Sequence, residues 1–274
     1  MTKLTNKELL EHIIPALKDD SDNVRASAVN ALGSILQADP SLAKDALEHI
    51  IPALKDDVWQ VRASASKVLG SIAHIDPSLA KEALEQIKPA LKDKDRDVRA
   101  SASEALGSIA HSDPSLAKEA LEHIKPFLKD EEWDVRDSAR KALWSILQAM
   151  PAKEALEHIK PFLKDDYSSV RESAIKVLGS IAQADPSLAK EALEHIIPLL
   201  KDEEWDVRDS ARKALGSIAH SDPSLAKEVL EQIKPFLKDD NWEVRCSAII
   251  GLRSILQTDP SLAKDVKVNN TNIT

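Results

Sequence analysis

The histidines are the residues of this chain best suited to metal binding or proton transfer, and they follow a pattern. One set follows a Glu and comprises His12, His49, His123, His158 and His195; the other follows Ile-Ala and comprises His74, His111 and His220. A neutral imidazole can ligate a metal or act as a general base. Gln takes the equivalent place at Gln86 and Gln232, and Gln is not a general base. The histidines therefore predict neither a metal site nor a catalytic base.

Other arrangements that carry chemistry are missing from the sequence. It contains no GxGxxG, Walker loop, CxxC or HExxH, the usual signatures of nucleotide, disulfide-exchange and zinc chemistry. Serines and carboxylates are numerous, but most recur periodically, as residues on solvated helix faces do. We expect no catalytic residues, no metal and no cofactor.

Composition narrows the classes of partner. The net charge of −9 argues against a general binder of nucleic acid or of anionic membranes. Cys246 is the single cysteine, which excludes an internal disulfide and fits a reducing compartment. The N-terminal sequence has no apolar signal region, and no later segment reaches membrane-spanning length. The sequence therefore predicts a cytoplasmic protein without a membrane partner.

The dipeptide Val-Arg marks an internal repeat. It occurs at 24–25, 61–62, 98–99, 135–136, 170–171, 207–208 and 244–245. Successive copies are 37 residues apart, as from 24 to 61, except for one step of 35, from 135 to 170. In the short step, residues 150–153 lack the Ser-Leu pair of the other repeat boundaries. A fixed period of this size is typical of stacked supersecondary units.

Each repeat has the pattern of two helices. The first begins at Asp-Pro, as at Asp39-Pro40, with Asp as the N-cap and Pro in the first turn. A further Pro recurs inside it, at positions 15, 52, 89, 126, 161, 198 and 235, and is expected to kink it at the same level in every repeat. The second helix carries an apolar stripe, for example Val61, Ala65, Leu69 and Ile72. No segment alternates with period two, so we expect no strands.

These features resemble HEAT repeats. The resemblance covers residues 6–257 and rests on the interior Pro, the Lys-Asp that ends the first helix, and the VRxxAxxxLGxI pattern of the second. That pattern is similar to the phycobilisome-lyase-type subgroup and its consensus-designed relatives. The resemblance implies an all-α fold, a right-handed α-solenoid of seven two-helix HEAT-like repeats of about 37 residues.

The repeat boundaries follow from the period. Residues 1–268 are expected to form a single HEAT-repeat α-solenoid, and residues 269–274 a polar tail. The repeats lie near 1–38, 39–75, 76–112, 113–149, 150–184, 185–221 and 222–258, with a partial repeat at 259–268. The near-identity of the repeats fits either recent duplication or consensus design.

The resemblance also gives a role to the recurring Asp and Arg residues. In HEAT arrays such residues form an Asp–Arg ladder between successive units, and the spacing from Asp56 to Arg62 recurs in every repeat. An anion-binding row of arginines is the alternative, which is disfavoured because each Arg comes with its own Asp. Small residues of the second helix, such as Gly70, would let the helices approach closely. Some HEAT-like enzymes hold two irons with His-Glu pairs, but this sequence contains no His-Glu.

The positions at which the repeats differ predict a binding surface. They stand two, five, six and nine residues after the Val of Val-Arg, on one face of the second helix. In a HEAT solenoid the second helices line the concave surface, so we expect a ligand there; neutral drift on an exposed face is the alternative. The residues expected at this surface and in its turns are Trp133, Asp137, Arg140, Lys141, Trp144, Glu172, Ile175, Lys176, Trp205, Asp209, Arg212 and Lys213.

Two kinds of Trp contribute to this prediction. Trp occurs four times at the position two residues before Val, as in Trp133 and Trp205, and once in place of a Gly, as Trp144. Trp is frequent at interface hot spots because it buries a large rigid area. At the first position, ligand contact and covering of the neighbouring repeat explain it equally well. Trp144 has no counterpart in other repeats and is the preferred single anchor.

The last repeat carries apolar residues where the others are mostly polar. They are Cys246, Ile249 and Ile250. Solenoids need a polar end unit to avoid exposing their stacking face. Either the segment 259–268 folds over this end, or the end pairs with another chain, which would make a homodimer through the C-terminal end.

Together these features predict a non-enzymatic scaffold that binds a protein or peptide of unknown identity on its concave face. Two alternatives stay open. A nucleic-acid binder is the less favoured, because acidic residues interrupt the one basic stripe. The stripe comprises Arg140, Lys141, Lys176, Arg212 and Lys213, and the interruptions are Asp137, Glu172 and Asp209. The other alternative is a designed or duplicated repeat scaffold without a dedicated ligand.

Overall fold

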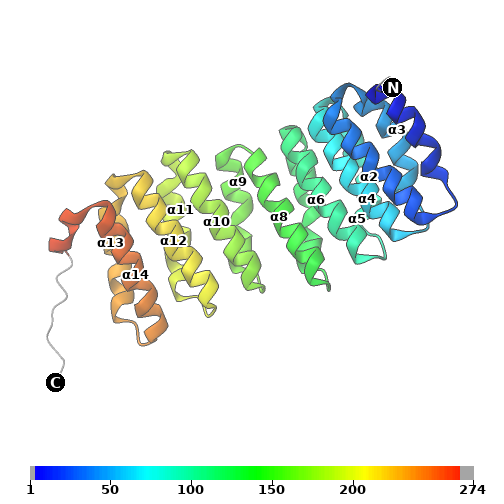
Figure 1. The fold of residues 1–274 in the computed structure, drawn as a ribbon. Coiled ribbons are helices and arrows are strands. Elements are labelled where there is room, and N and C mark those ends of the chain that lie inside the picture. The colour runs from blue at the N-terminus through cyan, green and yellow to red at the C-terminus, as the bar shows by residue number, and fades with distance from the viewer. Residues whose placement is uncertain (1–3, 266–274) are drawn as a thin grey trace. The chain divides into compact units, whose positions relative to one another are not determined.

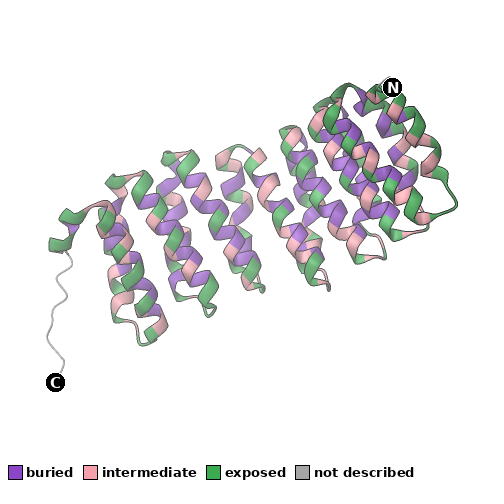
Figure 2. Ribbon diagram, in the orientation of Figure 1, coloured by how far each residue is buried: buried purple, intermediate pink, exposed green. Residues whose placement is uncertain are grey.

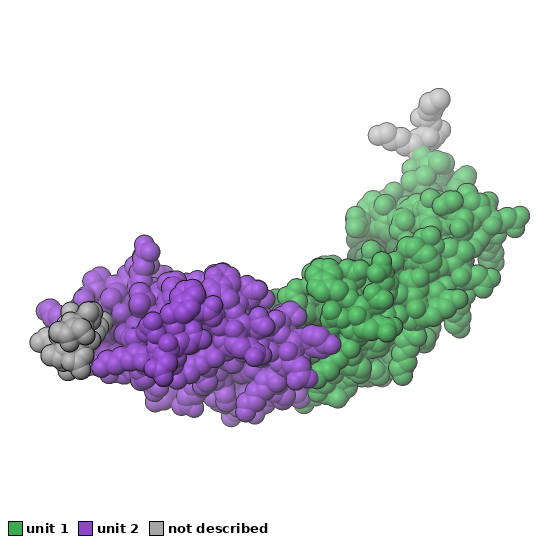
Figure 3. Space-filling view, turned by 90° about the horizontal axis from the view of Figure 1, so that it is seen from below, with its two compact units in different colours: residues 1–150 green, residues 151–274 purple. Residues whose placement is uncertain are grey.

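The computed structural model describes residues 4–265, and it contains no strand within that range. The chain divides into two compact units, residues 1–150 and residues 151–274 (Figure 3). The division falls where the sequence lacks the Ser-Leu pair of the other repeat boundaries. A single solenoid over residues 1–268 therefore stays a prediction, and the polar tail lies outside the described residues.

The first unit is built from pairs of helices, a first and a second helix for each repeat (Figure 1). Its first helices are α1 (Asn6–Ile13), α3 (Ala43–Ala53), α5 (Ala80–Leu91) and α7 (Ala117–Ile124). Its second helices are α2 (Asp22–Ala38), α4 (Trp59–Ile75), α6 (Arg96–Ser112) and α8 (Trp133–Ala149). The predicted pairing of a first and a second helix is thus confirmed in this unit.

The second unit repeats the same pattern. Its first helices are α9 (Ala152–Ile159), α11 (Ala189–Ile196) and α13 (Ala226–Ile233). Its second helices are α10 (Ser168–Ala184), α12 (Trp205–Ser221) and α14 (Trp242–Thr258). A short 3₁₀ segment, η11 (Pro260–Asp265), follows α14. The all-α fold of two-helix repeats that the sequence predicts is confirmed.

Short 3₁₀ turns open most of the first helices. They are η2 (Pro40–Leu42), η3 (Pro77–Leu79), η4 (Pro114–Leu116), η7 (Pro186–Leu188) and η9 (Pro223–Leu225). The carboxylate of Asp39 accepts hydrogen bonds from the Ser41 backbone at 3.2 Å and from its hydroxyl at 2.6 Å, which confirms Asp as the capping residue.

The interior proline changes the first helix in most repeats. Around it lie the 3₁₀ segments η1 (Ile14–Lys18), η5 (Lys125–Lys129), η6 (Lys160–Lys164), η8 (Ile197–Lys201) and η10 (Lys234–Lys238). Proline cannot donate the backbone hydrogen bond that an α-helix requires at that position. At Pro52 and Pro89, however, α3 and α5 continue as α-helix through the proline. The interior proline therefore does not give the same local structure in every repeat, and the kink expected at these two stays a prediction.

The core lies between the first and second helices of each unit (Figure 2). The apolar stripe predicted for the second helix is buried: Val61, Ala65, Leu69 and Ile72 are each at most 1% exposed. Burying one such Leu or Ile side chain contributes roughly 1.5–3 kcal/mol. The repeated stripe therefore accounts for the stacking of the helices.

Within each unit, second helices pack against each other far more extensively than first helices do. Glycine makes the closest of these approaches possible. A Cβ on Gly70 would lie 2.8 Å from the Cα of Ala105, and one on Gly107 would lie 2.9 Å from the Cα of Ala142. Only glycine fits at these crossings, which confirms the packing role predicted for it. Among residues 4–265, no helix is long and apolar enough to span a membrane.

Candidate functional site

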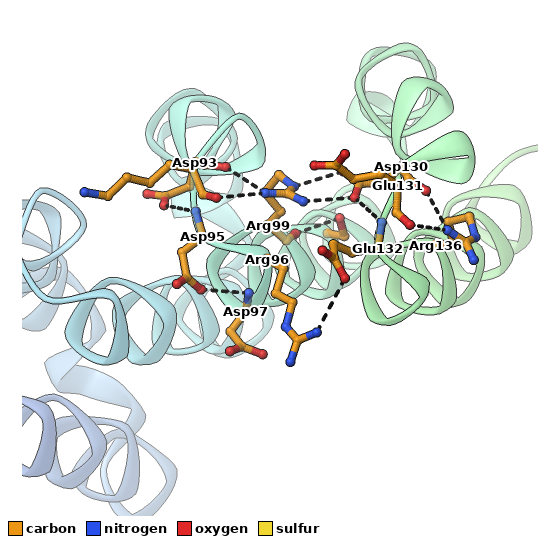
Figure 4. A network of polar contacts seen from close by, with 11 residues as sticks. Asp93, Asp95, Arg96, Asp97, Arg99, Asp130, Glu131, Glu132 and Arg136 are labelled. Atoms are coloured by element: carbon orange, nitrogen blue, oxygen red, sulfur yellow. Dashed lines mark hydrogen bonds and ion pairs between the residues drawn. The ribbon is translucent and has the colours of Figure 1, made fainter.

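An Asp–Arg ladder fixes the turns that precede the second helices. Arg62 donates from Nε and Nη2 to the two carboxylate oxygens of Asp93, at 2.7 and 2.8 Å. Its Nη1 donates to the backbone carbonyls of Asp56 and Asp57, at 2.8 and 3.0 Å. The same bidentate pair recurs as Arg25–Asp56, Arg99–Asp130 and Arg171–Asp202 (Figure 4 shows Arg99). The predicted ladder between successive repeats is confirmed for these pairs.

The ladder carboxylates are held in their ionised form. The hydrogen bond from Arg25 lowers the pKa of Asp56. Burial alone would raise the pKa of Asp93, but the hydrogen bonds from the Arg62 side chain and the Asp95 backbone, together with the nearby positive charges, outweigh it and the pKa is lowered. These arginines have their donors occupied by carboxylates and carbonyls, so they serve structure and not anion binding.

The ladder changes partners in the last repeat. Arg208 donates from Nη2 to Glu243 at 2.7 Å, and Asp239 accepts instead from Lys201 at 2.8 Å. Arg208 is 1% exposed, and its Nε has no hydrogen-bond partner within the described part of the chain. The recurring Asp and Arg positions of the sequence did not predict this exchange of partners. The exchange leaves the buried Nε of Arg208 unsatisfied within the described residues.

The charged residues predicted for the binding surface pair with each other on their own helices. On α8, Arg140 and Lys141 both donate to Asp137. On α12, Arg212 and Lys213 both donate to Asp209. On α10, Lys176 donates to Glu172. Each cation of the supposed basic stripe therefore has a carboxylate partner at hydrogen-bonding distance.

The pairing holds the acidic members ionised. Burial alone would raise the pKa of Asp137, but the hydrogen bonds from Lys141 and Arg140 outweigh it and the pKa is lowered. Asp209 shows the same balance with Lys213 and Arg212. Charges that neutralise one another offer less to a ligand than unpaired ones do.

The expectation that Ile175 faces a ligand is wrong. Its side chain is 0% exposed, and so are its counterparts Val29 and Ser66. This position points at the neighbouring second helix: in the last repeat, Gly251 of α14 lies against Arg212 of α12, which stands at the position of Ile175. A second helix packs against second helices on either side. Its solvent-exposed face is therefore narrower than the face formed by the four variable positions.

The position six residues after Val is the one that stays exposed. Its members are Asn30, Lys67, Glu104, Lys141, Lys176, Lys213 and Ile250. The usual Gly three residues later is buried at Gly70, Gly107 and Gly179. The variable positions therefore do not form one continuous exposed face.

The tryptophans at the start of the second helices are largely exposed. Trp133 is 66% and Trp205 61% exposed, so neither is used mainly to cover a neighbouring repeat. Trp59 is 38% exposed. Trp144 is half-buried, and its role as an anchor stays a prediction.

A groove between α4 and α6 was not predicted from the sequence. One hollow of about 330 Å³ is lined by Trp59, Ala63, Ser64, Ala100 and Ser101, among others, and by Lys67 and Glu104. A second hollow of about 280 Å³ is lined by Gly70, His74 and Ser108, among others, and again by Lys67 and Glu104. The two hollows share Lys67 and Glu104, so they adjoin along α4 and α6, and together they are called here the α4–α6 groove.

Small side chains produce this groove. Ala63 and Ala100 stand two residues after Val, where the charged repeats carry Asp137 or Glu172. Nothing on α4 or α6 at that level is long enough to fill the furrow between the two helices. The small side chains at these positions were therefore the feature of the sequence that indicates the groove. The predicted binding surface was instead chosen from the positions that differ most between repeats.

The polar groups of the α4–α6 groove are of both signs. Lys67 and Glu104 are exposed, and Glu104 accepts a hydrogen bond from the Ser138 hydroxyl at 3.2 Å. Asp97 and His74 lie farther along the groove. No group of three or more His, Cys, Asp or Glu within residues 4–265 is placed to hold a metal ion.

At the C-terminal end, η11 folds against α14 and Leu262 is only 7% exposed. Cys246 stays exposed, Ile249 is 56% and Ile250 40% exposed. The segment therefore covers part of the end but not these side chains. The remainder of the expected partial repeat, from residue 266, lies outside the described residues.

Comparison with known families and structures agrees with this architecture. Profiles described as HEAT repeats match residues 47–144, 121–216 and 193–266, and a HEAT repeat profile matches residues 9–38. No curated protein sequence matches the chain.

Two solved structures share the fold. One is an engineered protein, 22% identical, with a TM-score of 0.53, covering 91% of this chain and 70% of its own. The other belongs to the structure of Kap95p with RanGDP and is 19% identical, with a TM-score of 0.62 and 91% of this chain covered. This chain spans 36% of the length of the second.

Proposed function

The chain belongs to the HEAT-repeat family, and we propose that it is a non-enzymatic scaffold that binds a protein or peptide in the α4–α6 groove. The observation that carries the proposal is the pair of adjoining hollows around Lys67 and Glu104. Fold membership alone does not specify a ligand, because one fold serves many functions. The proposal therefore rests on the size, shape and chemistry of this groove.

The dimensions of the groove favour an elongated ligand. Its lining residues run from Trp59 to Ile75, the two ends of α4, which is roughly 24 Å at the rise of an α-helix. An extended peptide of about seven residues covers that length. The larger hollow, about 330 Å³, lies at the lower end of the volume range of ligand sites, and the smaller, about 280 Å³, lies just below it.

The lining favours a peptide with both apolar and charged side chains. Trp59 offers a partly exposed aromatic surface at one end. Lys67 and Glu104 stand in the middle and present charges of opposite sign. Within each unit the second helices pack closely against one another, which supports their lining the concave side of that unit, where the sequence predicts the ligand.

The exposed tryptophans support a contribution from the surface predicted first. Trp133 and Trp205 present more than half of their area to solvent, at the N-termini of α8 and α12. The charged residues near them are paired among themselves, so we assign the aromatic rings the larger part of any contact there. Such pairing also speaks against the nucleic-acid alternative, which needs several uncompensated cations.

A peptide display library selected on the immobilised chain tests the proposal. Binding of the selected peptides should fall in the groove variant Lys67→Glu/Glu104→Lys, which reverses both charges without changing the net charge. The matched control is Glu48→Lys/Lys81→Glu, an equal exchange at exposed positions of the first helices α3 and α5. A second variant, Trp133→Ala/Trp205→Ala, measures the contribution of the aromatic surface.

The proposal predicts loss of binding in the groove variant and full binding in the control. Equal binding by both would contradict the assignment to the α4–α6 groove. Loss only in the Trp133→Ala/Trp205→Ala variant would move the site to the surface predicted first.

A further inference from the structure

The Asp–Arg ladder ends in an open donor. Arg245 donates from Nη1 to the carbonyls of Asp239 and Asp240, at 2.7 and 2.9 Å, as the other ladder arginines do. Within the described part of the chain, its Nε and Nη2 have no partner, although in Arg62 these atoms hold the Asp of the next repeat. Arg245 therefore has donors free for a carboxylate that residues 4–265 do not supply.

The other end of the ladder is an open acceptor. The carboxylate of Asp19 accepts one hydrogen bond, from the Ser21 backbone at 2.9 Å, which is the turn-capping contact of its column. Its counterparts Asp56 and Asp93 make the same contact and also accept two bonds from an Arg of the preceding repeat. No cation pairs with Asp19 among residues 4–265.

Apolar side chains around Asp19 are uncovered in the same way. Val24 is 39% exposed, whereas its six counterparts are at most 3% exposed. Those counterparts are Val61, Val98, Val135, Val170, Val207 and Val244. Ile13 is half-buried, although its counterparts Ile50 and Ile87 are 0% exposed. This surface of α1 and α2 therefore carries the apolar side chains that other repeats bury, but here they are partly exposed.

The face of α14 around Arg245 is the complementary half. Ile249 is 56% exposed, whereas Val29 and Ile175, at the same position in other repeats, are 0% exposed. Leu252 is half-buried, and its counterpart Leu69 is fully buried. In the preceding repeat the counterpart of Ile249 packs against the second helix that follows, because Arg212 of α12 lies against Gly251 of α14, so the missing cover has the shape of a further repeat.

We propose that the α14 face of one chain binds the α1–α2 face of a second copy of this chain, with Arg245 of one copy paired to Asp19 of the next. Charge decides between the candidate occupants: an α14 face brought against another α14 face would place two arginines together, whereas Asp19 supplies the carboxylate that the ladder geometry requires. Val24 and Ile13 of the incoming copy cover Ile249 and Leu252.

The proposed contact joins two different surfaces. Such a contact leaves one free face at each end and therefore continues beyond a dimer. It also has a steric consequence: the residues of η11 correspond in sequence to the opening of a first helix, the place that the copy's α1 would take. Docking thus displaces Pro260–Asp265. The inference is independent of the ligand in the α4–α6 groove.

Sedimentation velocity over a concentration series tests the proposal with two charge reversals. The wild-type chain should form species larger than a dimer as its concentration rises. Asp19→Arg and Arg245→Asp, each alone, place like charges together and should lower the association constant at least about tenfold. An equimolar mixture of the two variants restores opposite charges at every contact and should associate again. Glu48→Arg, a reversal at an exposed position of α3, should leave association unchanged.

The mixture also controls for folding, because a variant that failed to fold could not regain association. The proposal is overturned if the wild-type chain stays monomeric over the whole series. It is equally overturned if Asp19→Arg associates like the wild type, which would indicate a symmetric contact between α14 faces, or if the mixture stays monomeric.

Discussion

Two equivalent pairs of second helices pack at different distances. They are α4 with α6 in the first unit and α10 with α12 in the second. All four helices have 17 residues and the same pattern of Val, Arg, Ala and Leu. A Cβ on Gly70 would come within 2.8 Å of the Ala105 Cα, but one on Gly179 would stay 3.8 Å from the Ala214 Cα. The first pair is therefore closer than the second.

The residue five after Val explains part of this difference. It is Ser66 on α4, whose hydroxyl turns back to the Arg62 carbonyl at 2.9 Å, and Ile175 on α10, which is fully buried. A buried Ile occupies space between helices that a Ser leaves free. Small residues thus bring α4 and α6 together and leave their outer surface hollow, while larger ones separate α10 and α12, and ion pairs occupy the surface above them.

The largest effect is expected from the ladder. Asp93→Ala leaves Arg62, whose side chain is 8% exposed, without its carboxylate, and should lower the free energy of unfolding by roughly 3–5 kcal/mol. Asp239→Ala in the second unit should cost much less, because its partner Lys201 is 58% exposed. Urea denaturation measures both, and equal losses would show that Asp239 stabilises its repeat as strongly as Asp93 does.

The spacer role of Ile175 gives the next effect. Ile175→Ser removes a fully buried side chain and should lower the free energy of unfolding by about 2–5 kcal/mol. If Ile175 faced a ligand, as the sequence predicted, the same change would alter binding and leave stability nearly unchanged. Thermal or urea unfolding of the variant separates the two roles.

A smaller effect distinguishes the two helix crossings directly. Gly70→Ala places a methyl group against the Ala105 backbone and should cost about 1–3 kcal/mol. Gly179→Ala adds a contact at an ordinary 3.4 Å from the Ala214 Cβ and should be neutral or stabilising. Similar unfolding midpoints for both variants would contradict the closer approach of α4 and α6.

The ladder also sets a modest dependence of stability on pH. The folded pKa of Asp56 lies below its unfolded value of about 3.9, since Arg25 donates to it. Its contribution is therefore complete above that pH and is lost as the pH falls through the folded value. Asp56→Asn should make the free energy of unfolding depend less on pH below about 4. Parallel curves for variant and wild type, from urea denaturation at a series of pH values, would exclude this contribution.

Local spacing made much of the fold predictable. The capping Asp39, the apolar stripe of α4 and the Asp–Arg pairs depend on positions within a repeat or on the offset to the next one. The sequence shows these positions repeatedly, and the Asp–Arg spacing recurs in all seven repeats. The partner exchange at Arg208 was not predictable, because it depends on Glu243 and Lys201, which lie outside the ladder columns.

The candidate site depended on information that a single repeat does not carry. Whether Ile175 or Lys176 reaches solvent is decided by the register of two neighbouring second helices. The groove at Ala63 and Ala100 forms because both helices carry small side chains at the same level. No single position of the sequence therefore predicts it. The prediction included Asp137 and Asp209 because charged and aromatic residues vary between the repeats there. Both carboxylates pair with arginines on their own helices.

Lys67 and Lys213 occupy the same position in different repeats, so they allow the most direct test of the proposed binding surface. A photo-crosslinking side chain is placed at position 67, in the α4–α6 groove, or at position 213, among the ion pairs of α12. Each protein is irradiated with the peptides selected on the wild-type chain, and the crosslinked products are measured by mass spectrometry. The groove account predicts crosslinks from position 67 and none from position 213. Crosslinks from position 213 alone would contradict it.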